Sequence, residues 1–203
     1  SSVSGGSSID ITNNVNSGIS LADGKEVTMS GLGNAGFHIT GNTTIDSAGV
    51  TDIIVGDLGI TSSDGDVDFL ITGNLGDSEF NVYSNIEVGD VTILSGQYDG
   101  EDALIDGGAV TVDIAGDVYS DTNVGAIDIT ATGNVSFSAT SLSGEAESTV
   151  DLGNTILINS SAGFVDFALD DVTGAETITI EAFNDITAAI TDSVFVESLT
   201  ISG

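Results

Sequence analysis

The chain has 203 residues, 40% of them hydrophobic, and it carries 32 acidic residues against a single Lys or Arg, which gives a formal net charge of −31. Phosphate backbones and anionic membrane surfaces are bound through Lys and Arg, so this charge excludes nucleic acid and acidic lipid as partners. The sequence has no apolar run long enough to insert into a membrane, and no cysteine for disulfides or thiolate chemistry.

The length fits one all-β domain spanning residues 1–203. Residues 1–35 are rich in Ser, Asn and Gly and are expected to form an N-terminal arm or the first coils. A regular repeat covers 36–160. Residues 161–203 keep the strand pattern but lose the Gly-Asn pairs, which indicates degenerate C-terminal coils.

The regular part repeats one unit: an alternating apolar arm, a Gly-Asn or Gly-Asp pair, and a second alternating arm. Residues 126–140, AIDITATGNVSFSAT, show the unit in full. Alternation with period 2 predicts strands with one buried face, and glycine followed by Asn or Asp predicts a tight corner. The glycines expected at equivalent corners are Gly41, Gly56, Gly73, Gly89, Gly116, Gly133 and Gly153.

The steps in numbering between neighbouring corner glycines are mostly similar, with a single wide one between Gly89 and Gly116. A narrow range of steps is typical of repeat architectures, and it favours a parallel β-solenoid with about 16–20 residues per coil. The alternative is an antiparallel β-sandwich built of hairpins, because Gly-Asn also forms two-residue hairpin turns. The absence of proline favours the solenoid, since sandwich loops usually contain some.

Two segments depart from the repeat. Residues 95–108, SGQYDGEDALIDGG, account for the wide step and predict a bulging loop or a degenerate coil. Residues 180–190, IEAFNDITAAI, have partial helical spacing, but Asn184 and Asp185 stand in the middle. We therefore expect a strand, a corner and a second strand there.

Two acidic loops are the candidate metal sites. Residues 64–68, DGDVD, begin like an EF-hand loop, but Phe69 and Leu75 occupy the positions that require Gly and Glu. Ligand sets made only of oxygen suit Ca²⁺ better than transition metals, so Ca²⁺ is the candidate cofactor of either loop. The alternative is that each loop is a solvated acidic turn with no cofactor. The candidate ligands are Asp64, Asp66, Asp68, Asp99, Glu101 and Asp102.

No residue pattern indicates a catalytic centre, and we expect the protein not to be an enzyme. The only histidine, His38, alternates with Phe37 and Ile39 and is expected to point outward from its strand. The sequence suggests no Ser/His/Asp grouping, and no pair of carboxylates stands out as a hydrolytic pair.

Residues 125–140, GAIDITATGNVSFSAT, and 86–93, IEVGDVTI, resemble the strand repeats of bacterial extracellular β-solenoids of the filamentous-haemagglutinin and autotransporter type. The resemblance covers roughly residues 36–160. It implies a surface adhesin, a matrix component or a rod that carries another domain, located outside the cell or on its surface. The chain departs from the pattern in its charge and in its few candidate adhesive aromatics, which are Phe80, Tyr83, Tyr98 and Tyr119.

The C-terminal stretch 193–202, SVFVESLTIS, predicts a strand whose edge is not blocked by proline or lysine. We expect it to pair with the first coil or N-terminal arm of a second copy, which makes head-to-tail homo-oligomers. The expected function is a structural extracellular subunit of a surface filament, sheath or biofilm matrix. The alternative is an adhesin stalk or a carbohydrate-binding surface module. The residues expected to carry the assembly are Val194, Val196, Leu199 and Ile201.

Overall fold

The structure is a computed structural model that describes residues 7–12, 19–21, 26–40, 50–72, 83–99, 103–116, 120–141, 148–192 and 196–203. Every regular element in these ranges is a β-strand. They contain no helix of the length and apolarity that a membrane crossing requires.

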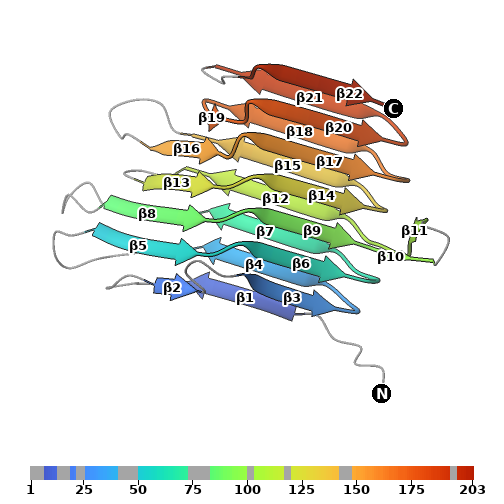
Figure 1. Cartoon of the computed structure of the whole chain (residues 1–203), viewed down its shortest axis with the longest axis horizontal. Helices are drawn as coiled ribbons and strands as arrows, with labels where there is room; N and C mark the ends of the chain where they lie inside the picture. Colours follow the sequence, from blue (N-terminus) through green and yellow to red (C-terminus); the bar gives the residue numbers. More distant parts are fainter. Residues whose placement is uncertain are drawn as a thin grey trace.

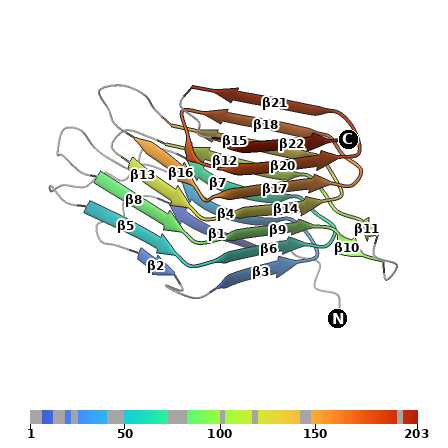
Figure 2. The ribbon, with the colours of Figure 1, turned by 45° about the horizontal axis from the view of Figure 1, so that its top comes forward.

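The strands form three parallel sheets, which are the walls of a solenoid (Figures 1 and 2). Sheet A contains β1 (Ser7–Thr12), β4 (Ala35–Thr40), β7 (Val67–Thr72), β12 (Val110–Ala115), β15 (Val135–Thr140), β18 (Val165–Asp170) and β21 (Ile186–Thr191). Sheet B contains β2 (Ile19–Leu21), β5 (Val50–Val55), β8 (Tyr83–Val88), β13 (Ser120–Val124), β16 (Thr149–Leu152) and β19 (Thr173–Gly174). Sheet C contains β3 (Val27–Gly31), β6 (Leu58–Ser62), β9 (Val91–Ser95), β14 (Ile127–Ala131), β17 (Thr155–Ser160), β20 (Thr177–Ala182) and β22 (Ser198–Ser202).

The parallel β-solenoid predicted from the repeats is confirmed, but its coils are longer than predicted. In sheet A, the shortest coil runs from Val165 to its in-register partner Ile186, and even this coil exceeds the predicted range. The longest runs from Val67 to Val110. The predicted length is wrong because a coil contains three corners, so one step between Gly-Asx pairs spans only part of a coil.

For the same reason, the predicted corner glycines are not equivalent. The corner between sheets B and C holds Gly56, Gly89 and Gly153, the corner between sheets C and A holds Gly133, and Gly116 directly follows β12 of sheet A. Gly41 and Gly73 lie outside the described residues. A Gly-Asx pair satisfies any tight corner, so the pair alone does not distinguish one corner from another.

Successive corners approach each other too closely for side chains. A Cβ added at Gly133 would lie 2.4 Å from the carbonyl oxygen of Gly108 in the preceding coil, and one at Gly163 would lie 2.4 Å from the carbonyl oxygen of Gly133. The stacked backbones therefore require glycine at these positions.

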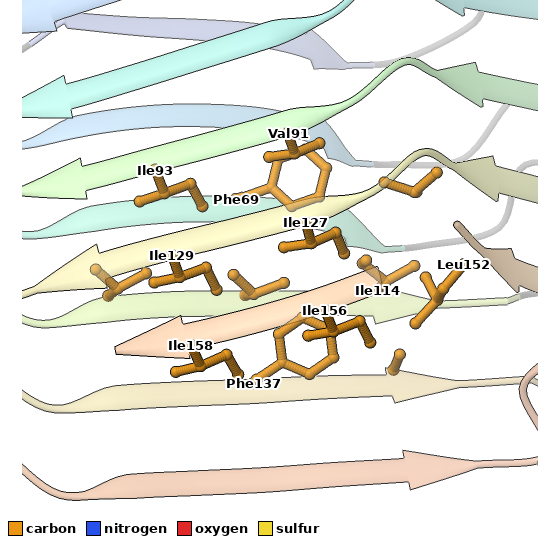
Figure 3. Close-up of a cluster of buried hydrophobic side chains, with 14 of the residues drawn as sticks. Phe69, Val91, Ile93, Ile114, Ile127, Ile129, Phe137, Leu152, Ile156 and Ile158 are labelled. Atoms are coloured by element: carbon orange, nitrogen blue, oxygen red, sulfur yellow. The ribbon is translucent and has the colours of Figure 1, made fainter. Parts of the chain in front are cut away.

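The core consists of columns of identical or similar side chains that the parallel register places one above another. In sheet A, one inward column contains Phe37, Phe69, Val112, Phe137 and Phe167. Its rings stack with centroids 6.0 Å apart for Phe37 and Phe69, and 5.1 Å apart for Phe137 and Phe167. Isoleucine and valine of sheet C face these rings (Figure 3). The apolar residues at alternate positions of each strand thus face inward, and together they form one continuous aliphatic and aromatic core.

The two irregular segments behave as expected. Between β9 and β12 the chain forms a small antiparallel hairpin of β10 (Gln97–Tyr98) and β11 (Leu104–Ile105), which projects from the stack (Figure 1). The 180–190 segment forms the end of β20, a corner, and all of β21 except its last residue, so the prediction of strand, corner and strand is confirmed.

Candidate assembly surface at the two ends

The last coil exposes side chains that are buried in the coils before it. In sheet C, Ile178 and Ile180 of β20 are completely buried, whereas their in-register partners Leu199 and Ile201 of β22 are 45% and 47% exposed. Leu199 and Ile201 face the same interior, but no described strand lies beyond them. In the described part of the chain, the coil of β22 therefore exposes an apolar surface.

Sheet A ends in the same way. The inward positions of β21 are Ile186, Ala188 and Ile190, which pair in register with the buried Val165, Phe167 and Leu169 of β18. Ile186 and Ile190 are only partly buried against the core, and Ala188 is exposed.

Val196, in the segment before β22, also packs against the core and is partly buried. Of the four residues expected to carry assembly, the structure thus places Val196, Leu199 and Ile201 at the C-terminal end. Val194 lies outside the described residues.

The backbone hydrogen bonds have the same phase in the described coils. Inward-facing residues donate to the following coil, as Val27 N–H does to the Asp57 carbonyl at 2.7 Å. Outward-facing residues donate to the preceding coil, as Ser198 N–H does to the Glu176 carbonyl at 3.0 Å. Because peptide groups alternate in direction along a strand, those of Leu199 and Ile201 point away from β20 and form an open edge.

The opposite end has the complementary phase. In β3, the inward residue Val27 is bonded to the neighbouring coil, so the peptide groups of the outward residues Thr28 and Ser30 form its open edge. In β1, Ser7 N–H donates to the Asn34 carbonyl at 3.0 Å, which likewise leaves the groups of Ser8 and Asp10 on the open side. If a second copy stacked on the first, the open peptide groups of the two edge strands would therefore alternate in the same way as those of neighbouring coils within one chain. They could then form the same pattern of hydrogen bonds.

Charge is almost absent from the edge strands, although the chain is strongly acidic. The strands at the C-terminal edges, β19, β21 and β22, contain no charged residue, and neither do β2 and β3 at the other end. The one exception is Asp10 of β1, whose Oδ1 accepts a hydrogen bond from Nδ1 of His38 at 2.7 Å. Edges of soluble sheets are usually protected by charge, so uncharged edges favour strand addition.

An open groove lies beside β20 and β22, with a volume of about 360 Å³. Phe183, which is 76% exposed, lies along it, together with Glu181 and Ser202. The groove adjoins the corner that follows β20, so it is continuous with the open end of the stack.

The predicted metal ligands do not gather into one site. Asp64 and Asp66 are exposed at the corner between β6 and β7, and Asp66 Oδ1 accepts a hydrogen bond from Ala109 N–H at 2.8 Å. Asp68 faces outward from β7, and in the hairpin Asp99 Oδ1 accepts a bond from Ala103 N–H at 3.2 Å.

Glu101 and Asp102 fall outside the described residues. Among the described residues, no group of three or more acidic or histidine side chains is placed to hold a metal. Binding of Ca²⁺ stays a prediction.

The candidate adhesive aromatics do not form a stripe that the structure describes. Tyr98 is 59% exposed in the β10–β11 hairpin, while Phe80 and Tyr119 lie outside the described residues and only the backbone of Tyr83 is described. Sequence reasoning missed the pairing of Asp10 with His38, because it depends on the true length of the first coil, which the repeat steps do not give.

Comparisons with protein-family models, with curated proteins and with solved structures found no match for this chain. The geometry itself therefore defines the class: a parallel β-solenoid with three sheets, whose edge strands contain almost no charged residue.

Proposed function

We propose that the protein is a structural subunit that stacks head to tail through the two ends of its solenoid and builds a filament, sheath or matrix. The observation that supports this most directly is the exposure of Leu199 and Ile201 on an open strand edge. Full burial of an exposed side chain of this kind contributes about 1.5–3 kcal/mol, of which roughly half is still to be gained here, and the unpaired peptide groups gain partners in the same contact.

A second copy is the partner that fits these ends. If the coil register continues across the junction, Thr200 of one copy lies beside Thr28 of the next, and Ala189 lies beside Asp10. Each such pair contains at most one acidic residue. The contact is heterologous, so it repeats and produces a fibre rather than a closed dimer.

The location that goes with this role is extracellular or on the cell surface. Its support is the resemblance of residues 36–160 to extracellular bacterial repeats. An acidic outer surface would keep neighbouring fibres apart at low ionic strength and let them approach when cations screen the charge.

The test compares two substitutions on the same strand. Leu199→Glu places a carboxylate on the inward column, where a stacked copy would bury it, whereas Thr200→Glu adds the same charge on the outer face. Sedimentation velocity and negative-stain electron microscopy at about 0.15 M salt, where the Debye length is about 8 Å, should show rods for the wild type and for Thr200→Glu.

Leu199→Glu should weaken association at least tenfold and leave a folded monomer, because burying an unpaired carboxylate is costly. Ile201→Pro should act in the same direction, since it removes a peptide N–H from the open edge rather than one bonded to β20. A wild-type protein that stays monomeric at high concentration and in added salt would contradict the proposal.

A further inference from the structure

The only histidine of the chain is held in a defined orientation on the outer face of sheet A. His38 of β4 pairs in register with Asp10 of β1, and its Nδ1 donates to Asp10 Oδ1 at 2.7 Å. Asp10 Oδ2 accepts a second hydrogen bond from the Ser8 hydroxyl at 3.1 Å. With Nδ1 fixed as the donor, the neutral imidazole presents the lone pair of Nε2.

That second nitrogen is buried and has no partner within the described part of the chain. The ring leans over Gly36, where a Cβ would lie 2.8 Å from Nε2 and 3.1 Å from Cε1. A side chain at position 36 would displace the ring from this place, whereas glycine leaves it room, although glycine inside a strand is unfavourable by roughly 0.5–1 kcal/mol relative to alanine. A buried nitrogen without a partner indicates a water or an ion that completes it.

The ring borders a cavity of about 200 Å³, whose lining also includes Ser7, Ser8, Gly36 and Asp68. Asp68 of β7 is the in-register partner of Gly36, one coil further along sheet A. No described residue donates a hydrogen bond to its carboxylate. The hydroxyl of Ser7 is likewise buried without a partner in the described residues. Three polar groups thus border one cavity with unused bonding capacity.

We infer that this cavity is a binding site for a transition-metal dication such as Zn²⁺ or Cu²⁺, with His38 Nε2 and the Asp68 carboxylate as its protein ligands and water in the remaining positions. The site lies beside β1, the edge strand of sheet A at the N-terminal end, and metal binding there goes beyond the structural role. Imidazole nitrogen suits Zn²⁺ and Cu²⁺, whereas the all-oxygen loops expected from the sequence suit Ca²⁺.

Asp10 is the positioning residue of this site. Metal-bound histidines commonly donate their other ring N–H to a carboxylate, which fixes the tautomer and makes the ligating nitrogen more basic. The large negative charge of the chain attracts cations and repels anions, so a phosphate or carboxylate ligand is disfavoured at the same cavity.

The experiment is a Zn²⁺ titration of the full chain by calorimetry, with excess Mg²⁺ present to occupy unspecific carboxylates. One Zn²⁺ site should appear in the wild type. His38→Gln and Asp68→Asn should each weaken it at least tenfold, and Asp10→Asn should weaken it by about 10–100-fold. The matched control is Asp166→Asn, which removes the same charge from the same outer column of sheet A, three coils from Asp68.

A second readout does not depend on the stability of any variant. Cu²⁺ bound to the wild type should show hyperfine coupling to imidazole nitrogen by electron paramagnetic resonance, and the chain has only one imidazole. Absence of this coupling would overturn the assignment. Equal Zn²⁺ affinity in His38→Gln, or an equal loss in Asp166→Asn, would also overturn it.

Discussion

The middle coils and the last coil present the same columns of residues, but only the middle coils are covered on both sides. Ile158 of β17 and Ile201 of β22 occupy the same inward column of sheet C, yet Ile158 is completely buried and Ile201 is 47% exposed. The difference does not come from the residue or from its place in the strand. It comes from the coils on either side of Ile158, of which Ile201 has only one.

Burial in this fold is thus a property of stacking, not of a single strand. A coil between two others buries its inward face completely, and an end coil leaves part of that face open. This is the expected behaviour of solenoids, in which each repeat contacts only its neighbours. An end coil that keeps large aliphatic residues is therefore suited to a further coil, which in the proposed assembly belongs to a second copy.

The largest expected effect is the loss of stability when an isoleucine of this inward column is shortened to alanine. Ile158→Ala should lower the free energy of unfolding by about 2–5 kcal/mol, because it leaves a cavity between two coils. Ile201→Ala removes the same atoms from a half-covered position and should cost about 1 kcal/mol in the monomer. Urea unfolding at low protein concentration measures both, and equal losses would mean that this end is not open in solution.

A smaller effect concerns the hydroxyls inside the stack. Ser160 is buried, donates to the Gly133 carbonyl at 2.8 Å and accepts from Gly163 N–H at 3.0 Å. Ser160→Ala leaves both backbone groups unsatisfied and should cost about 1–3 kcal/mol. Ser136→Ala, on the outer face of β15, should change stability by less than about 0.5 kcal/mol. If the two variants unfold alike, the buried hydroxyl does not stabilise the corner.

The smallest expected effect concerns a carboxyl group on the outer face of a coil that has a neighbouring coil on each side. Asp128 of β14 lies in register between Thr92 and Leu157, and burial raises the pKa of its carboxyl above the ordinary value. The folded state then holds this proton more tightly than the unfolded state, so the stability contributed by Asp128 is lost as the pH rises through the folded-state pKa.

Asp128→Asn should therefore raise the melting temperature slightly at neutral pH, and the gain should vanish in acid. Asp151→Asn, at an exposed position of β16, controls for the loss of one charge from a very acidic chain. A gain that is the same for both variants, or that persists below the acid transition, would assign the effect to net charge alone.

The sequence predicts the fold well because alternation reports directly on inward and outward positions. Phe37, Ile39 and the outward His38 between them lie as their spacing indicates. Coil length was not predictable from the same pattern, since Gly-Asx pairs mark corners of different kinds. Gly125 shows the difficulty: it occupies the corner between β13 and β14 like Gly89 in the coil before, but Ala126 follows it and hides the repeat.

The sites were harder to predict than the fold for a related reason. The parallel register of β1 and β4 makes Asp10 and His38 neighbours, although nothing in the local sequence links them. The metal sites were predicted at the acidic loops because the candidate ligands there are close in sequence. Of these, Asp68 borders a cavity, and the other residues of that lining come from two earlier coils. Contacts between coils depend on register, which one strand alone does not specify.

The β10–β11 hairpin has a consequence for how such a rod can change length. It inserts extra chain between β9 and β12, yet Val110 still pairs in register with Val67. Each coil advances the rod by about 4.8 Å whatever the amount of chain in its corners. The length of the rod therefore depends on the number of coils and not on the number of amino acids. A peptide grafted between Tyr98 and Leu104 would be displayed at a fixed height along the rod, and the spacing of the other coils would not change.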